Sequence, residues 1–175
     1  MTGVRMELTG AEEALRFLGD AAAKAEKPRE LYDEIGAALV ASTQHRFEEE
    51  EDPEGNPWPD SLRKSLFGGR TLTVSSRLVG SITHEPSDEG VAVGTNVIYA
   101  AIHQFGGTIK AKTPISSFTE GGLRFKSPSG AWVRKDEVTM PRRAFLGIDE
   151  DDEAEIEFIA AGYLGAGTDA RRPRP

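Results

Sequence analysis

The sequence predicts an α+β fold: a small antiparallel β-sheet flanked by two or three helices, with an extended inserted β-hairpin. Residues 31–47 place apolar side chains at helical spacing, which predicts a long amphipathic helix. Residues 91–107 combine an alternating apolar pattern, turn residues and a second helical pattern, which predicts a strand, a turn and a short helix. Three later segments alternate apolar with polar or basic residues and predict the strands of the hairpin: 108–112, 123–126 and 131–135.

Length and composition favour one small core with long exposed parts. The chain has 175 residues, of which 38% are hydrophobic, 29% are charged and 19 are glycines. We expect a single α+β domain over residues 1–164, with the inserted β-ribbon over residues 107–140. Residues 165–175 form a basic tail that lacks core-forming side chains, and we expect this tail to be disordered by itself.

Charge and the lack of cysteine exclude several classes of function. The net charge of −8 argues against general affinity for nucleic acid. Without cysteine the chain has neither disulfides nor thiolate metal sites. No apolar run approaches the ~20 residues that span a membrane, and the N-terminus lacks the basic and apolar regions of a signal peptide. We therefore expect a soluble protein made in the cytoplasm.

The N-terminal third is predicted to be mainly helical. Residues 4–8 alternate like a short strand, and Thr9 and Glu12 have the spacing of a capping box for a helix that ends near Ala25. Pro28 suits the first turn of a second helix, roughly six turns long at ~3.6 residues each. The face of this helix predicted to be buried comprises Leu31, Ile35, Ala38, Leu39, Ser42 and Phe47.

Turn-rich sequence follows the second helix. Five consecutive acidic residues, 48–52, oppose the helix dipole, so we expect the helix to fray there. Residues 52–59 have the composition of a linker, and Trp58 is expected to pack on the core. Asp60 is a candidate cap for a short helix over residues 61–67.

The middle of the chain is predicted to form a hairpin and a short helix. The region around Ile82 and the region around Val91 have the pattern of two paired strands joined by a turn. Residues 97–105 then place apolar side chains at helical spacing before two glycines end the helix: Ile98, Ala101, Ile102 and Phe105.

The predicted ribbon is basic within an acidic protein. It carries six basic residues, Lys110, Lys112, Arg124, Lys126, Arg134 and Lys135, against three acidic ones, Glu120, Asp136 and Glu137. An isolated hairpin is marginally stable in water, so we expect the ribbon to need a partner. A second acidic run, 149–153, lies where the dipole favours it, at the start of a helix whose apolar face comprises Ile156, Ile159, Ala160 and Tyr163.

The sequence offers little support for catalysis or for a metal site. The three histidines, His45, His84 and His103, have no metal-binding spacing. No nucleophile elbow or phosphate-binding loop occurs, so we predict no catalytic residue, no cofactor and no enzymatic activity. A hydrolase that uses His103 is the weaker alternative. The favoured interpretation is that its ring bonds a backbone group and fixes the turn into the ribbon.

The two acidic runs are most simply solvated surfaces, and neither has the alternation of a calcium loop. A more specific hypothesis is a contact between copies, in which acidic residues of one chain meet the basic ribbon of the next. Such a heterologous contact can close into a ring. The residues assigned to this interface are Lys110, Lys112, Arg124, Lys126, Trp132 and Arg134 on the ribbon, with Glu49, Glu50, Asp151 and Asp152 opposite.

Several motifs, taken together, carry a family resemblance. They are Arg46-Phe47, Asp52-Pro53-x-Gly55-x-Pro57-Trp58, Leu78-x-Gly80-Ser81-Ile82, Val93-Gly94-Thr95-Asn96, Tyr99-Ala100-Ala101-Ile102-His103-Gln104-Phe105-Gly106 and Pro141-x-Arg143-x-Phe145-Leu146-Gly147. The chain resembles the phage virion-morphogenesis family, the tail-completion proteins of Mu-like and P2-like tailed phages. The resemblance covers about residues 31–163, and the combination of the last two motifs is its most specific part.

The resemblance implies a non-enzymatic structural protein that completes or terminates a phage tail. It implies a homo-oligomeric ring, often hexameric, at the head–tail junction of the virion, made in a bacterial host. Its partners would be further copies, the tail tube protein and head–tail connector proteins, with incidental contact to DNA in the lumen and no membrane. The alternative is a head-side connector or capsid-assembly factor that acts transiently. The motif residues would then be structural: Tyr99, His103, Gln104, Phe105, Gly106, Arg143 and Phe145.

Overall fold

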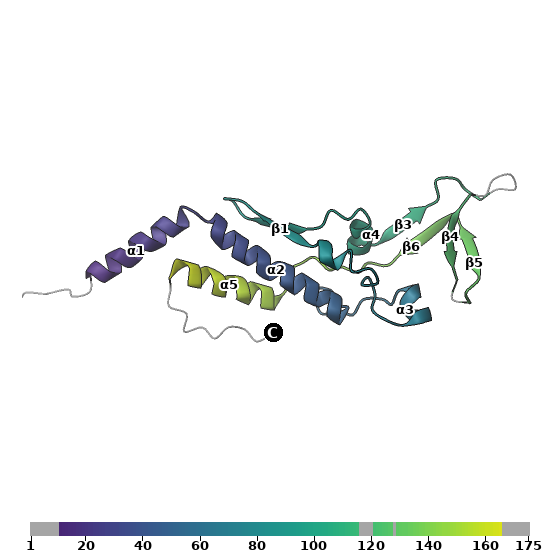
Figure 1. The fold of residues 1–175 in the computed structure, drawn as a ribbon, viewed down its shortest axis with the longest axis horizontal. Helices are drawn as coiled ribbons and strands as arrows, with labels where there is room; N and C mark the ends of the chain where they lie inside the picture. Colours follow the sequence, from purple (N-terminus) through teal and green to yellow (C-terminus); the bar gives the residue numbers. More distant parts are fainter. Residues whose placement is uncertain (1–10, 116–120, 128, 166–175) are drawn as a thin grey trace, which may run out of the picture.

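The molecule is an elongated α+β structure, which confirms the predicted fold class (Figure 1). The computed structural model describes residues 11–115, 121–127 and 129–165. Helices α2 and α5 lie side by side at its centre, α1 extends from one end, and strands β4 and β5 form the other end (Figure 1). The helices are α1 (Ala11–Ala25), α2 (Arg29–Glu49), α3 (Leu62–Phe67), α4 (Ala100–Phe105) and α5 (Glu150–Leu164), with a 3-10 turn at Val79–Ser81.

The strands form three separate antiparallel pairs in the part of the chain that the structure describes. One hairpin pairs β1 (Thr83–Pro86) with β2 (Val91–Gly94), as expected from the sequence. The inserted ribbon contains two successive pairs. The inner pair joins β3 (Gly107–Lys110) to β6 (Glu137–Met140), and the outer pair joins β4 (Leu123–Lys126) to β5 (Trp132–Lys135). The last of these strands in the chain, β6, was not predicted.

Helix α2 is the main support of the body. Its Gly36 lies against the hairpin, because a Cβ there would come within 2.5 Å of the ring of His84 on β1. The helix ends at the acidic run, where Glu50 adopts a left-handed conformation with φ 61° and its amide donates to the carbonyl of Arg46. The predicted buried face is confirmed at Ile35 and Phe47, whereas Leu31, Ala38, Leu39 and Ser42 are only partly buried.

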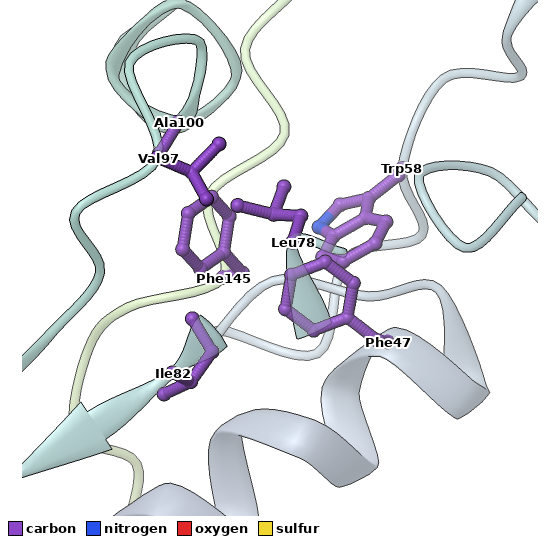
Figure 2. Close-up of a cluster of buried hydrophobic side chains, with 7 residues drawn as sticks. All are labelled: Phe47, Trp58, Leu78, Ile82, Val97, Ala100 and Phe145. Atoms are coloured by element: carbon purple, nitrogen blue, oxygen red, sulfur yellow. The ribbon is translucent and has the colours of Figure 1, made fainter. Parts of the chain in front are cut away.

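The hydrophobic core is small and draws on segments that are far apart in the sequence (Figure 2). Phe47 and Phe145 are fully buried and in contact, with ring centroids 5.1 Å apart. Trp58 meets Phe47 edge-on at 5.3 Å and is 6% exposed, which confirms that it packs on the core. Leu78, Ile82, Val97 and Ala100 complete the cluster. Each large side chain of this kind contributes about 1.5–3 kcal/mol through removal of its surface from water.

The short helix α4 buries a different face from the predicted one. Ile98 is 97% exposed and Phe105 is 76% exposed, whereas Val97 and Ala100 enter the core. The reason lies in the approach to the helix: residues 97–99 form a turn, closed by the amide of Ala100 on the carbonyl of Val97 at 2.9 Å. The small Ala100 thereby lies next to the core cluster, and the larger apolar side chains face outward.

Helix caps agree with the predictions only in part. Ser61, not Asp60, caps α3, and its hydroxyl accepts from the amide of Lys64 at 3.1 Å. Asp149 forms a reciprocal capping box with Asp152 at the start of α5. At the other end of α5, the hydroxyl of Tyr163 donates to the carbonyl of Lys27 at 2.8 Å, which ties α5 to the turn after α1. The predicted strand over residues 4–8, the cap at Thr9 and the tail over residues 166–175 lie outside the described residues.

Candidate interaction site

Arg46, on the last full turn of α2, is the central polar group of the body. Its side chain is 4% exposed. One terminal nitrogen, Nη1, donates to the carbonyl oxygens of Phe145 at 3.3 Å and Gly147 at 2.9 Å. The other, Nη2, donates to Asp149 Oδ2 at 2.7 Å and to the buried carboxylate of Asp152. A single guanidinium therefore holds the end of α2, the segment after β6 and the start of α5 together.

Gln104 fixes α4 against the same segment. Its side-chain nitrogen donates to the carbonyl of Leu146 at 2.8 Å. Its Oε1 accepts from the backbone amides of Phe145 and Leu146, both at 3.0 Å. The amide side chain thus pairs with the backbone as a neighbouring strand would. Because buried backbone groups need partners, Gln104 determines how α4 lies on residues 145–146.

Arg143 joins a third segment to these two. Its Nε donates to the carbonyl of Pro59 at 2.6 Å and its Nη2 to the carbonyl of Asp60 at 3.1 Å, while its own amide donates to the carbonyl of His103. Burial lowers the pKa of the Arg143 guanidinium, and the nearby Asp60 carboxylate acts in the opposite direction. We refer to Arg46, Gln104 and Arg143 as the polar junction.

His103 lies half-buried beside the polar junction. Burial, and then the positive charge of Arg143, lower the pKa of its imidazole, so the ring is neutral at pH 7. Its buried Nδ1 has no hydrogen-bond partner in the described part of the chain, and its ring meets Tyr99 edge-on at 6.1 Å. The predicted bond from the ring to a backbone group is therefore absent at Nδ1. The turn is held by the carbonyl of His103 instead, which accepts from Arg143.

The ribbon residues assigned to the interface lie on the surface. Lys110 and Lys112 are exposed, and so are all four members of one face of the β4–β5 pair. On that face, Arg124 lies opposite Arg134, and Lys126 lies opposite Trp132. The guanidinium carbon of Arg124 is 4.6 Å from the Trp132 ring centroid, and Lys126 Nζ is 5.7 Å from it. Trp132 is 59% exposed, so the face presents an aromatic ring between cations.

The acidic half of the predicted interface needs correction. Glu49 and Asp151 are exposed, as expected. Asp152 is not available, because its side chain is 5% exposed and its carboxylate pairs with Arg46. Glu50 is also used within the chain, since it accepts from Lys64 Nζ at 2.7 Å and from the amide of Thr71. Burial opposes ionisation of Glu50, but the bonds from Lys64 and Thr71 outweigh it and lower the pKa of the carboxyl.

Sequence reasoning missed the contacts of the polar junction. Arg46, Gln104 and Arg143 were assigned through motifs, without a partner for any of them. Two signals were present: an arginine beside a buried phenylalanine on α2, and an acidic pair at the start of α5. Neither signal reveals that residues about a hundred positions apart meet.

Across the described ranges, no group of three or more histidine or acidic side chains is arranged to hold a metal ion. In the same ranges, no helix combines the length and the apolar composition that crossing a membrane requires.

Comparison with known proteins identifies the family. The model of the phage virion morphogenesis family matches residues 9–165, nearly the whole chain. The chain belongs to this family.

Two relatives from phage genomes agree with the family match. The chain is 30% identical over 131 residues to a protein of Escherichia phage Mu that bears the name capsid assembly protein G, with 70% of each chain covered. It is 29% identical over 153 residues to the Mu-like prophage FluMu G protein 2 of Haemophilus influenzae, with 87% of this chain and 90% of the relative covered. No solved structure matches.

Membership of the virion morphogenesis family gives this chain a role in assembling phage particles and makes it a virion-associated protein. The family is defined by morphogenesis and not by an enzymatic activity. Several of the motif residues that carried the resemblance have internal roles: Phe47, Trp58 and Phe145 are in the core, and the polar junction connects the segments around them.

Proposed function

We propose that this chain is a structural tail-completion protein that forms a homo-oligomeric ring at the head–tail junction of a tailed phage or phage-like particle. A hexamer is the ring size that the family resemblance favours. Its partners would be further copies, the tail tube protein and the head–tail connector proteins, and DNA would touch the lumen only incidentally. In this role the protein would reside in the tail or neck of the virion and have no catalytic residues.

The observation that carries this proposal is the division of the chain into a fixed body and a projecting ribbon. The polar junction fixes the place where β3 and β6 leave the body. Gln104 precedes β3 in the chain and accepts from the amide of Phe145, and Arg143 follows β6 and donates its amide to the carbonyl of His103. The outer pair, β4–β5, then lies at the far end of the molecule (Figure 1). A two-stranded pair is marginally stable by itself, so a rigidly placed projecting pair suits contact with a neighbouring subunit.

A ribbonless variant tests the proposal. The amide of Ala111 donates to the carbonyl of Asp136 at 2.7 Å, so residues 112–135 can be replaced by an Asn-Gly turn that closes β3 onto β6. We expect the variant to fold and to remain monomeric, while the full chain forms one closed oligomer by native mass measurement. A matched control replaces only residues 128–130, between the hydrogen-bonded Ser127 and Ala131, by the same turn, which keeps the register of β4 and β5. An unchanged oligomer in the ribbonless variant would contradict the role of the ribbon.

A second candidate is a head-side connector or capsid-assembly factor that acts transiently. The name of the phage Mu relative, capsid assembly protein G, favours it. Particle composition separates the two functions. A tail-completion ring remains in purified virions, and its loss leaves heads without joined tails. A transient factor is absent from virions, and its loss stops the formation of complete heads.

A further inference from the structure

A groove on the body has a surface complementary to the exposed face of the ribbon. It lies between residues 51–55 and the start of α5 and encloses about 550 Å³. Seven of its ten lining residues are acidic and none is basic: Glu51, Asp52, Glu54, Asp149, Glu150, Asp151 and Glu153. The remaining three are Pro53, Gly55 and Ile148. The lining of the groove thus combines seven carboxylates with a small apolar area.

Three residues of the groove, Glu51, Glu54 and Ile148, are not explained by the needs of the fold. Acidic residues in the first turn of α5 are accounted for by the helix dipole. The dipole does not account for Glu51 and Glu54, which precede α5 by about a hundred residues, nor for Ile148, which is 57% exposed among the carboxylates. Pro53 packs on Gly147, where a Cβ would come within 2.4 Å of its ring. This close approach holds the two walls of the groove together.

The exposed face of the β4–β5 pair is basic where the groove is acidic, and it also presents an apolar surface. It offers cations at Arg124 and Lys126 around the exposed ring of Trp132. The two surfaces are complementary in both charge and apolar area: the cations face carboxylates, and the aromatic ring has an apolar surface to cover. The half-buried residues of the opposite face of the pair, Leu123, Phe125 and Val133, are uncharged.

We propose that the face formed by Arg124, Lys126 and Trp132 docks into the acidic groove of a second copy of this chain. A second copy is required because β4–β5 projects from the end of the molecule, away from the start of α5 (Figure 1). The contact joins different surfaces of the two copies, so it is heterologous and can repeat around a ring. This inference rests on the proposed ring and names the interface that would build it. Of the acidic residues assigned from the sequence, it keeps Asp151 and replaces Glu49, Glu50 and Asp152 with other carboxylates of the groove, Glu54 among them.

A charge-swap experiment tests the docking. Arg124→Glu with Lys126→Glu reverses the ribbon face, and Glu54→Lys with Asp151→Lys reverses the groove. Both pairs are exposed, so the fold should persist, as circular dichroism and thermal unfolding would verify. We expect each double variant to self-associate at least about tenfold more weakly than wild type by sedimentation, since close interface charges couple strongly. Combining all four substitutions in one chain should restore self-association.

Controls reverse charges outside the proposed contact. Lys135→Glu lies on the opposite face of the pair, and Glu34→Lys with Glu157→Lys lies outside the groove. These controls should associate as wild type does. Trp132→Ala should weaken association without any change in net charge, which separates the aromatic contribution from the electrostatic one.

Each alternative outcome overturns the inference in an identifiable way. If the combined variant associates no better than either double variant, the ribbon and the groove do not meet. If Arg124→Glu with Lys126→Glu abolishes binding of a duplex DNA oligonucleotide and leaves self-association intact, the face recognises nucleic acid instead. If wild type forms a ring that none of these variants affects, the docking fails while the proposed function stands. If wild type remains monomeric and is absent from particles, both fail.

Discussion

The two tryptophans of the chain show how differently the body and the ribbon are built. Trp58 is 6% exposed, donates its indole N–H to the carbonyl of Ala144 at 2.8 Å and meets Phe47 edge-on. Trp132 is 59% exposed and lies among cations on a two-stranded pair. In the body, an aromatic side chain completes contacts between distant segments of its own chain. On the ribbon, a similar side chain is left facing outward, where only another molecule can cover it.

The same difference holds for the charged residues. Arg46 is surrounded by carbonyl and carboxylate oxygens of its own chain, and Arg143 by carbonyl oxygens. Arg124 on the ribbon stacks over an exposed ring. These arginines of the body thus bond within their own chain, although Arg46 Nε and His103 Nδ1 are buried without a hydrogen-bond partner in the described ranges. We propose that the body serves stability and the ribbon serves assembly. Substitutions in the two regions should separate these properties.

The largest contrast is expected between the two tryptophans. Trp58→Ala should lower the free energy of unfolding by about 4 kcal/mol, because it leaves a cavity and removes the donor to Ala144. Trp132→Ala should change it by less than about 1 kcal/mol, since only exposed cation–π contacts are lost. Urea unfolding measures both. Equal losses for the two variants would mean that the ribbon is part of the folding core.

The arginines give the next contrast. Arg46→Met leaves Asp149 and the buried Asp152 without their cation. We expect the free energy of unfolding to fall by about 3 kcal/mol. This value is at the lower end of the range for broken buried ion pairs, because Asp149 is partly exposed. Arg124→Met on the ribbon should cost less than about 1 kcal/mol. Unfolding curves at neutral pH test the pair. A loss below about 1 kcal/mol for Arg46→Met would show that the junction is dispensable.

A smaller effect is expected at Gln104. Gln104→Leu keeps the approximate size but removes a partner from the amides of Phe145 and Leu146 and from the carbonyl of Leu146. Unsatisfied buried groups of this kind should cost about 2 kcal/mol. Gln44→Leu on α2 is the control, since the side chain of Gln44 makes no hydrogen bond to the described residues. Amide hydrogen exchange at residues 145 and 146 should accelerate only in the Gln104 variant.

The smallest effect concerns pH. Burial opposes ionisation of Asp149, but the hydrogen bond from Arg46 outweighs it and lowers the pKa of the carboxyl below its ordinary value. A lowered pKa in the folded state contributes stability above the unfolded pKa, and this contribution is lost as the pH falls through the folded pKa. Asp149→Asn should therefore be less stable than wild type at neutral pH, with the difference narrowing in acid. A stability difference between Asp149→Asn and wild type that does not change with pH would contradict the ion pair. Glu157→Gln, at an exposed position, is the control.

Local patterns were sufficient for much of the fold. The helical spacing on α2, the packing of Trp58, the β1–β2 hairpin and the ribbon strands β3, β4 and β5 follow from composition, periodicity and turn residues, which act over a few positions. The family resemblance likewise followed from short motifs, and the family match agrees with it. The exposed cations Arg124 and Lys126 were predictable because alternation places both on one face of β4.

Only the tertiary structure decided which apolar face of α4 is covered and which charges are internal. Periodicity shows that a face is apolar, but the turn at residues 97–99 directs Ala100, not Phe105, to the core. A run of acidic residues predicts a solvated surface, yet Asp152 pairs with Arg46 and Glu50 with Lys64. The physical reason is that the cost of burying a charge depends on its partner, and the partner of Asp152 lies 106 residues away in the chain.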